Sequence, residues 1–321
     1  MKIIYCGSGE FGVPCLDAIA GYKHQLLHIF TQPSHPAGRG LKSRPTPVAQ
    51  WAHIHSIDYT EVTDINAANV RAKIAAFNAE LMVVIAFGQK LSNDIITLPR
   101  HGAINVHASL LPKYRGAAPI NWAIINGETQ TGISIITLAQ KLDAGEILAQ
   151  EKTDILPDDT ASSLHDRLAK FAAPLLLNTI GKIETGTAVY RPQDISLVTK
   201  APKFKKSDGN IDWSEPAQTL CNKIRGMWSW PEAESHFVHQ ATGKCERVIF
   251  AKCEVAPKTS TQFVAPGMVD ENLNVVCGKD AIKVLMIKPA GSSLMDFKSF
   301  CNGRATAPGD LFMKIQPADH K

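Results

Sequence analysis

Two polar side chains alternate with apolar ones in residues 102–107, and these two side chains could act together in a reaction. Ile104 and Val106 indicate a buried strand. Residues two apart on a strand face the same side, so Asn105 and His107 point in one direction. Such a pair suits a reaction in which negative charge develops on a carbonyl oxygen, because preorganised hydrogen-bond donors stabilise that charge. Acyl-type transfer is therefore the first class of reaction to consider.

A longer motif surrounds this pair. By itself, an Asn-x-His spacing also fits an amide that caps a loop beside a structural histidine. The full run is Asn-x-His-x-Ser-Leu-Leu-Pro at 105–112, with Asp-Ala-Gly downstream at 143–145. This combination closely resembles the formyltransferases that use 10-formyltetrahydrofolate. Arg-Gly-Ala-Ala-Pro at 115–119 is similar to the methionyl-tRNA formyltransferase branch of that family, and the resemblance covers nearly the whole chain.

The resemblance implies an activity, a catalytic set and a folate pocket. The activity is transfer of the formyl group of 10-formyltetrahydrofolate to the α-amino group of methionyl-initiator tRNA, for translation initiation. The residues that match the family's catalytic positions are Asn105, His107 and Asp143. By the same analogy, the folate lies against Phe87 and the backbone of Gln89, Lys90 and Leu91, and the Asp143 loop completes the pocket together with Ser109, Leu110, Leu111 and Pro112.

Residues 33–47 form a proline- and glycine-rich loop with three basic residues and no acidic one. Clustered Arg and Lys attract phosphates, although a solvated loop without any ligand has the same composition. Pro-Ala-Gly-Arg-Gly at 36–40 resembles the tRNA-contacting loop of methionyl-tRNA formyltransferases. Together with the lysines of a downstream linker, the expected tRNA-binding set is Arg39, Lys42, Arg44, Lys203, Lys205 and Lys206.

Composition bounds the class of protein. The 321 residues are enough for two domains, and 45% hydrophobic with 20% charged residues is typical of a globular protein. No apolar run is long enough to cross a membrane, and residues 1–6 enter a strand without the features of a secretory signal. We therefore expect a cytoplasmic protein without a membrane partner, which acts as a monomer.

Seven cysteines are spread along the chain without a C-x-x-C pair, which argues against a disulfide framework or a zinc site. Cys6, in an expected strand, is best interpreted as a small buried apolar residue. The histidines outside the motif show no paired spacing on one helix face that would bind a metal. We predict no metal site, and 10-formyltetrahydrofolate only as a co-substrate.

Strands and helices alternate through the first 185 residues. The expected strands are 2–7, 24–31, 81–87, 102–107, 132–138 and 146–152, and the expected helices are 11–21, 65–78, 119–126 and 161–185. This alternation predicts a Rossmann-like α/β domain with a mostly parallel sheet covered on both faces.

The chain changes character after residue 189, where four lysines crowd into residues 200–206. We expect a linker at 190–209 between a catalytic domain at 1–189 and a tRNA-binding domain at 210–321. In the latter, a short helix near 217–226 precedes strand-like runs at 247–255, 268–269, 273–277 and 281–286. Short strands separated by turns predict a small β-barrel of the oligonucleotide-binding kind.

Charge and aromatic residues limit how this second domain could bind nucleic acid. From residue 207 onwards there are 13 basic and 13 acidic residues, so binding would need one basic strip and not a basic domain. Trp213, Trp228 and Trp230 are expected in the core and not as platforms on which bases stack.

Gly7, Gly9 and Gly12 match the G-x-G-x-x-G dinucleotide fingerprint after a strand. A dinucleotide site also needs an acidic residue at the end of the second strand, but that strand ends Phe-Thr-Gln-Pro at 30–33. We therefore interpret the glycines as close packing between strand and helix. The formyltransferases that the chain resembles have fewer glycines in this turn.

Three other functions share parts of this pattern. A purine-pathway formyltransferase acting on glycinamide ribonucleotide would end near residue 200 and lack Arg-Gly-Ala-Ala-Pro. A sugar-nucleotide N-formyltransferase using the same cofactor is the main alternative, since it has a similar catalytic segment and a second domain, but it lacks the loop at 36–40. A nucleic-acid-binding protein with a degenerate catalytic domain does not explain three intact catalytic positions.

Overall fold

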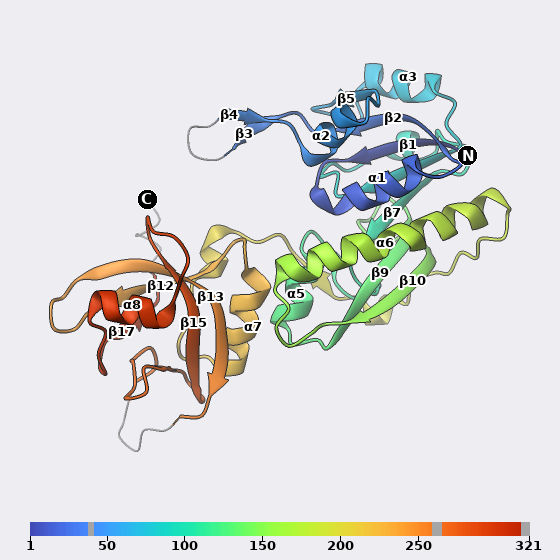
Figure 1. Cartoon of the computed structure of the whole chain (residues 1–321). Helices are drawn as coiled ribbons and strands as arrows, with labels where there is room; N and C mark the ends of the chain where they lie inside the picture. Colours follow the sequence, from blue (N-terminus) through green and yellow to red (C-terminus); the bar gives the residue numbers. More distant parts are fainter. Residues whose placement is uncertain (38–41, 259–264, 316–321) are drawn as a thin grey trace. The chain divides into compact units, whose positions relative to one another are not determined.

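The structure is a computed structural model that describes residues 1–37, 42–258 and 265–315. The chain divides into two compact units (Figure 1). The N-terminal unit contains Met1–Pro119, Gln130–Asp154 and His165–Pro202. The C-terminal unit contains Ile120–Thr129, Ile155–Leu164 and the chain from Lys203 onwards. Neither unit is therefore one continuous stretch of sequence.

A seven-stranded sheet forms the centre of the N-terminal unit, in the order β10-β9-β7-β6-β1-β2-β5. The strands from β7 to β5 are parallel, whereas β9 and β10 run antiparallel to their neighbours. The predicted Rossmann-like, mostly parallel sheet is confirmed. Its strands are β1 (Lys2–Gly7), β2 (Gln25–Thr31), β5 (Tyr59–Glu61), β6 (Leu81–Ile85), β7 (Ala103–His107), β9 (Gln130–Thr137) and β10 (Ile147–Asp154).

Position in the sheet explains the composition of the strands. All five residues of β6, Leu-Met-Val-Val-Ile, are buried. A strand covered on both faces needs apolar side chains at every position, which is why this run does not alternate. The edge strand β10 is different, because the side chains of its Gln-Glu-Lys run at 150–152 are largely accessible to solvent.

The helices of the N-terminal unit connect these strands, and the last of them begins in the C-terminal unit. They are α1 (Val13–Ala20), α2 (Pro47–Ile54), α3 (Ala68–Ala76), α4 (Asn93–Ile96) and α6 (Ala161–Glu184). Three short 3-10 helices also occur within the described ranges: η1 (Glu10–Gly12), η2 (Ile195–Leu197) and η3 (Lys206–Gly209).

Two short strand pairs lie outside the main sheet. β3 (His35–Ala37) and β4 (Lys42–Arg44) pair antiparallel, so the expected loop at 33–47 contains a two-stranded ribbon. β8 (Arg115–Gly116) and β11 (Lys200–Ala201) pair parallel, so the expected linker contributes a strand to the N-terminal unit.

The C-terminal unit is built on an antiparallel sheet in the order β14-β15-β13-β12-β17, with β16 beside β15. Met268 bridges to Leu311 in β17 and Val269 bridges to Val275 in β14, so this segment connects the two outer strands. The predicted small β-barrel is thereby confirmed. Its strands are β12 (Ala233–Val238), β13 (Cys245–Ala256), β14 (Val275–Val276), β15 (Ala281–Pro289), β16 (Met295–Asp296) and β17 (Leu311–Met313).

The helices α5 (Pro119–Ile125), α7 (Ala217–Met227) and α8 (Phe297–Arg304) belong to the C-terminal unit. Its core includes Trp213, which is 4% exposed, as expected. Trp228 is half-buried, and Trp230 is 53% exposed, so the expectation that Trp230 lies in the core is wrong.

The sequence pattern did not predict β12, because two of its buried residues are polar. Glu234 is fully buried and forms an ion pair with Arg247. Ser235 is also buried, accepts a hydrogen bond from Trp213 Nε1 at 3.1 Å, and donates one to the Met313 carbonyl at 2.6 Å. Buried polar side chains that have an ion-pair or hydrogen-bond partner can occupy a core position, but they break the apolar alternation by which a strand is recognised.

Within the ranges that the structure describes, no helix is both long enough and apolar enough to span a membrane.

His28 on β2 is a buried histidine whose charge bears on stability. Its Nε2 lies 2.7 Å from Thr60 Oγ1, and its ring stacks on Phe77 with a centroid distance of 4.8 Å. Burial, helped by the nearby charge of Lys73, lowers the pKa of His28 to about 4. The folded protein therefore holds a neutral ring at a pH where an unfolded chain would protonate it.

We expect folding stability to fall as the pH drops from about 6.5 to about 4. In this range His28 binds a proton in the unfolded chain but not in the folded protein. His28 should account for roughly 2 kcal/mol of the loss between about pH 7 and about pH 4.5. Urea unfolding at both pH values tests this: His28→Gln should reduce the loss by that amount. His53→Gln, at an exposed position of α2, is the matched control, and an equal effect in the two variants would contradict the assignment.

Candidate active site

The predicted folate-binding segments leave the sheet at one edge. β6 and β7 are parallel neighbours, with Val84 paired to Asn105. Residues 86–91 follow β6 and residues 108–112 follow β7, so both segments start from the carboxyl ends of adjacent strands. Ligands of open α/β sheets bind in the crevice outside this edge.

Asn105 and His107 lie two residues apart on β7, which places them on one face of the sheet. Asn105 is half-buried and His107 is 6% exposed. His107 Nε2 lies 2.9 Å from the carbonyl oxygen of Tyr114. Because a carbonyl can only accept a hydrogen bond, Nε2 carries a hydrogen and donates it. Nδ1 is then the ring nitrogen that is available for chemistry.

The structure brings the third predicted residue to this nitrogen. Asp143 Oδ2 lies 3.7 Å from His107 Nδ1, and both side chains are more than nine-tenths buried. Neutral His107 points a bare Nδ1 at the carboxylate, whereas protonated His107 points an N–H at it. The geometry thus places the Asp143 carboxylate beside the one ring nitrogen of His107 that the Tyr114 carbonyl does not occupy.

Asp143 reaches this position from an unexpected direction. Because β9 is antiparallel to β7, its last residue, Thr137, pairs with Ile104 and not with His107. The loop that carries Asp143 therefore starts beside the other half of β7 and must run back along the strand. Asp143 adopts a left-handed backbone conformation with a φ of 52°. Contacts from elsewhere must hold the loop in place.

One such contact comes from the backbone of β8. The Gly116 N–H donates a hydrogen bond of 2.9 Å to Asp143 Oδ2, the same oxygen that faces His107. Gly116 has a φ of 132°, and a Cβ atom there would lie 2.3 Å from the Ala201 carbonyl oxygen of β11. Only glycine allows this close approach. The Arg-Gly-Ala-Ala-Pro run thus has a structural reason for its glycine.

Gln193 holds the loop from the other side, and sequence reasoning missed it. Its Nε2 donates to the carbonyl oxygens of Asp143 at 2.8 Å and Gly145 at 2.7 Å. Its Oε1 accepts from Arg115 Nε at 3.1 Å and Nη2 at 2.7 Å. A glutamine carries no chemical signature in sequence, and this one stands in the segment interpreted as a linker.

The segment after β6, expected to line the folate, is mostly committed to packing. Phe87 and Leu91 are 2% and 4% exposed and belong to the hydrophobic core. Gln89 Oε1 accepts a hydrogen bond of 2.8 Å from the Ile65 N–H, whereas Lys90 is exposed. The side chains of this segment brace it, which leaves mainly its backbone to meet a ligand.

The segment after β7 is fixed in a similar way. Ser109 is fully buried, and its Oγ donates to the Lys113 carbonyl at 2.7 Å. Ser134 on β9 donates to the Ser109 carbonyl at 2.6 Å and accepts from the Leu111 N–H at 3.0 Å. Leu111 is buried, whereas Leu110 and Pro112 are half-buried. Ser109 and Leu111 therefore shape the turn more than they offer surface.

The basic residues expected to contact tRNA are placed only in part. Arg39 lies outside the described residues. Lys42 opens β4, and Arg44 ends it with an exposed side chain. These residues precede α2 in the N-terminal unit, whereas the expected lysines after residue 202 belong to the C-terminal unit.

Those lysines differ in their surroundings. Lys203 and Lys205 are exposed on either side of Phe204, which is buried and stacks on Trp122 with a centroid distance of 4.7 Å. Lys206 is half-buried; its Nζ donates to the Pro231 carbonyl and lies 3.4 Å from Glu232 Oε2. The charge of Lys206 is thus balanced within the protein, whereas Lys203 and Lys205 face solvent.

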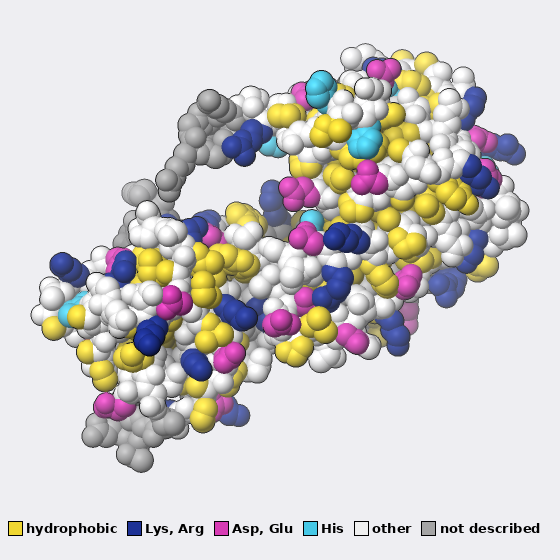
Figure 2. All heavy atoms as spheres, viewed as in Figure 1, with side chains coloured by type: hydrophobic (Ala, Val, Ile, Leu, Met, Phe, Trp, Pro, Cys, Tyr) yellow, Lys and Arg dark blue, Asp and Glu magenta, His cyan; other side chains and the backbone are white. Residues whose placement is uncertain are grey.

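The surface of the C-terminal unit is mixed in charge, as its equal numbers of acidic and basic residues imply. On the face drawn in Figure 2, its Lys and Arg side chains are interspersed with Asp and Glu. A phosphate-binding strip would therefore have to be local.

The glycine-rich turn after β1 serves packing. A Cβ atom on Gly12 would lie 1.9 Å from the Tyr5 hydroxyl oxygen, and one on Gly7 would lie 2.5 Å from the Tyr5 ring. Tyr5 is fully buried. Gly7 and Gly12 therefore make room for a tyrosine ring inside the strand-to-helix turn, which accounts for two of the glycines that depart from the family pattern.

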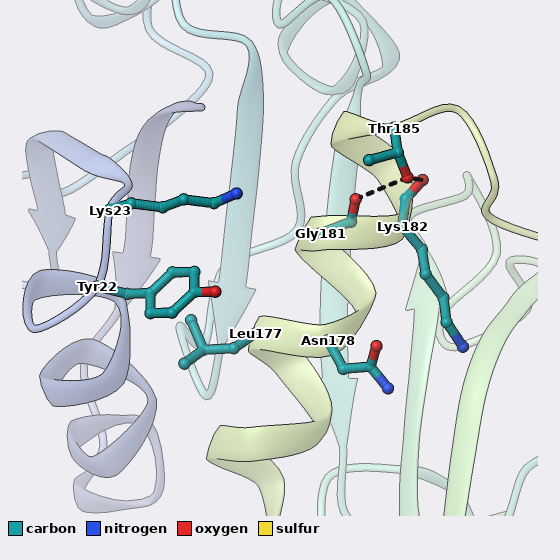
Figure 3. Close-up of a pocket in the computed structure, with 7 residues that line it drawn as sticks. All are labelled: Tyr22, Lys23, Leu177, Asn178, Gly181, Lys182 and Thr185. Atoms are coloured by element: carbon teal, nitrogen blue, oxygen red, sulfur yellow. Dashed lines mark hydrogen bonds between the residues drawn. The ribbon is translucent and has the colours of Figure 1, made fainter.

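A surface pocket elsewhere in the N-terminal unit contains none of the predicted site residues. It lies between the turn before β2 and the last turns of α6 (Figure 3), and Lys23 on its rim pairs with Glu184 at 3.2 Å. Its lining is Tyr22, Lys23, Leu177, Asn178, Gly181, Lys182 and Thr185. In the three ranges that the structure describes, no group of three or more His, Cys, Asp or Glu side chains could hold a metal ion.

Comparison with known proteins decides the family. Residues 1–180 match the model of the formyl transferase family, and residues 203–305 match that of the formyl transferase C-terminal domain. The methionyl-tRNA formyltransferase of Trichlorobacter lovleyi is 38% identical over 97% of this chain and 97% of its own length. The chain belongs to the methionyl-tRNA formyltransferase family. The formyltransferase of that name from Alkaliphilus oremlandii is likewise 38% identical, over 97% of this chain and 99% of its own.

A solved structure shares the fold of this formyltransferase. The sugar 3N-formyltransferase WlaRD, solved in the presence of dTDP and 5-N-formyl-THF, aligns with a TM-score of 0.64 and 15% identity. The alignment covers 91% of this chain and 99% of WlaRD. At this identity, the likeness shows a common fold alone.

The contacts of Gln193 predict a loss of turnover when they are removed. Gln193→Ala deletes two hydrogen bonds to the Asp143 loop, each worth about 1 kcal/mol, so we expect kcat for formyl transfer to fall roughly tenfold or more. KM for the formyl donor should change little. Gln193→Glu keeps an acceptor for Arg115 but loses the donor, so it should lose turnover as well.

Gln140→Ala, at an exposed position in the same loop, is the matched control and should retain wild-type kcat. If Gln193→Ala also retained it, Gln193 would have no part in positioning Asp143.

Proposed function

We propose that this formyltransferase transfers the formyl group of 10-formyltetrahydrofolate to the α-amino group of methionyl-initiator tRNA, for translation initiation. The observation that carries the proposal is 38% identity to curated methionyl-tRNA formyltransferases over 97% of the chain. The likeness to a sugar formyltransferase is 15% in sequence and does not favour a sugar nucleotide as acceptor.

Asn105, His107 and Asp143 would divide the work of the reaction. The α-amine of the methionyl group would attack the formyl carbon of 10-formyltetrahydrofolate. The bond between that carbon and N10 would then break, and N10 would take up a proton so that tetrahydrofolate leaves. The amide of Asn105 donates to the formyl oxygen as negative charge develops there. His107 contributes through Nδ1, because its Nε2 hydrogen is engaged by the Tyr114 carbonyl. Asp143 stabilises the charged imidazole and takes up the proton of the amine, directly or through water.

The folate donor would occupy the crevice outside β6 and β7. We assign it to the segment of Phe87, Gln89, Lys90 and Leu91 on one side and to residues 109–112 on the other. Support comes from two observations: both segments start at one sheet edge, and both are held by internal hydrogen bonds. The proposal assigns no role to a metal and takes the protein to act as a monomer.

Initiator tRNA would contact both units. The proposed contacts in the N-terminal unit are Arg39, Lys42 and Arg44. In the segment after residue 202, the exposed Lys203 and Lys205 are better placed for phosphate than Lys206, which is paired within the protein. We propose residues 210–321 as the tRNA-binding domain and residues 190–209 as the connection to it.

Removal of Asn105 should act mainly on turnover. Asn105→Ala deletes an oxyanion donor, so we expect kcat to fall by about 10² to 10³ without a matching change in KM.

His107→Ala should be at least as damaging. Because we propose that His107 and Asp143 act as one unit, the loss of kcat in the double variant His107→Ala, Asp143→Ala should be far smaller than the product of the two single losses. Steady-state kinetics of the single and double variants would measure this. A loss in the double variant equal to the product of the single losses would show that the two residues act independently.

Salt dependence distinguishes a tRNA acceptor from a small one. Changing Arg39, Lys42 and Arg44 to Ala should weaken tRNA binding and reduce the log–log salt slope by about 0.7 to 0.9 for each phosphate that is no longer neutralised. Affinity for the folate donor should not change. The matched control removes three exposed lysines of the same unit, by the changes Lys152→Ala, Lys170→Ala and Lys182→Ala.

A direct assay of acceptor specificity can use the same wild-type and loop-variant proteins. Labelled formyl should pass from 10-formyltetrahydrofolate to charged initiator tRNA and not to a sugar nucleotide or to glycinamide ribonucleotide. Preferential transfer to the sugar nucleotide, with equal salt slopes for wild type and loop variant, would replace the proposed acceptor by the alternative one.

A further inference from the structure

Two cysteines of the C-terminal unit lie in contact although they are 32 residues apart in the chain. Cys221 is on α7 and Cys253 is on β13, and their sulfur atoms are 3.2 Å apart. Cys221 is 8% exposed, and Cys253 is partly buried and packs against the same hydrophobic core. Neither takes part in formyl transfer as proposed above.

The two thiols have different acidities. Cys253 donates its S–H to Cys221 Sγ. This hydrogen bond, aided by the nearby charge of Arg225, lowers the pKa of Cys221, and the same bond together with burial raises the pKa of Cys253. The thiolate is the reactive form of a cysteine, so Cys221 is the nucleophile of the pair.

The other buried cysteines provide a contrast within the same unit. Burial raises the pKa of Cys277 to about 12, and burial also raises the pKa of Cys301. Both therefore stay protonated and inert as thiols. A buried cysteine is ordinarily a small apolar residue, and Cys277 and Cys301 fit that description. Cys221 differs from them in having a thiol donor and a guanidinium beside it.

We propose that Cys221 and Cys253 form a peroxide-sensitive site that closes to a reversible disulfide between α7 and β13. A disulfide needs sulfur atoms about 2.05 Å apart, so the two side chains must approach by about 1.1 Å. Rotation of the two cysteine side chains would supply this shift.

The reaction balances with hydrogen peroxide as the oxidant. The Cys221 thiolate attacks one peroxide oxygen, the O–O bond breaks, and the departing hydroxide takes up a proton to leave as water. Cys221 is then a sulfenic acid. Cys253 Sγ attacks Cys221 Sγ and its thiol proton passes to the hydroxyl group, which leaves as a second water. Two thiols are oxidised to one disulfide while one peroxide is reduced to two waters.

The bond would fix α7 to the barrel. Arg225, one turn after Cys221, donates to the Leu156 carbonyl at 3.2 Å and to the Asp159 carbonyl at 3.3 Å. The link would therefore restrain a helix whose end also holds the segment before α6. Dithiol reductants would reverse it.

The test treats the full-length protein with stoichiometric hydrogen peroxide, blocks the remaining thiols under denaturing conditions, and maps peptides by mass spectrometry. We expect a Cys221–Cys253 linked peptide, a loss of two of the seven thiols, and full recovery with dithiothreitol. In Cys253→Ser, a sulfenic acid at Cys221 should react with dimedone. In Cys221→Ser, Cys253 should stay reduced.

The proposal is overturned if both cysteines alkylate fully after peroxide treatment, or if the linked peptide appears only in protein unfolded before oxidation. A link from either cysteine to the exposed Cys245 in place of the expected pair would also overturn it. Cys277→Ser is the matched control, since it removes a neighbouring buried thiol and should leave the linked peptide unchanged. Circular dichroism of each serine variant shows that the barrel is folded before oxidation.

Discussion

The candidate active site depends on the loop that carries Asp143. This loop begins beside the start of β7 but must be held against its other end, where His107 lies. Antiparallel pairing of β7 with β9 sends the chain away from His107 before Asp143 is reached. A carboxylate on an unsupported loop would explore many positions, and ordering it costs about 1–2 kcal/mol per residue. The protein meets this cost with hydrogen bonds from the Gly116 backbone and the Gln193 amide. The contacts that orient Gln193 therefore also orient the Asp143 carboxylate of the candidate site.

Local chemistry explains what could be read from the sequence. The buried strands β6 and β7 are rich in apolar residues, and the Asn-x-His spacing places two side chains on one face because strands have a period of two. The third residue, Asp143, was found through the family's motif and not through topology. The role of Gln193 could not be predicted from the sequence, because its hydrogen-bond acceptors, the carbonyls of Gly145 and Asp143, are 48 and 50 residues away in the chain.

Buried polar groups and unusual packing account for the remaining differences. β12 carries a buried glutamate whose partner, Arg247, is on the neighbouring strand, so its sequence does not alternate. The turn after β1 resembles a dinucleotide fingerprint because Tyr5 needs space, and not because a phosphate does. In both cases, the structural role of a short sequence pattern depends on a side chain that contacts it in the folded protein. The exposure of Trp230 belongs to the same class, since composition alone does not state what covers an aromatic ring.

The strand pair β8–β11 has a consequence for where the catalytic part of the chain ends. Gly116, which holds Asp143, is paired with Ala201, and Tyr114, which holds His107, donates its own N–H to Thr199 Oγ1 at 2.8 Å. A fragment cut at residue 180 or 189 would keep Asn105, His107 and Asp143 but lose the strand β11 and the Thr199 and Gln193 side chains that support the segments around His107 and Asp143. Residues 190–202 therefore belong to the N-terminal unit, and a fragment that is meant to keep the candidate site must include them.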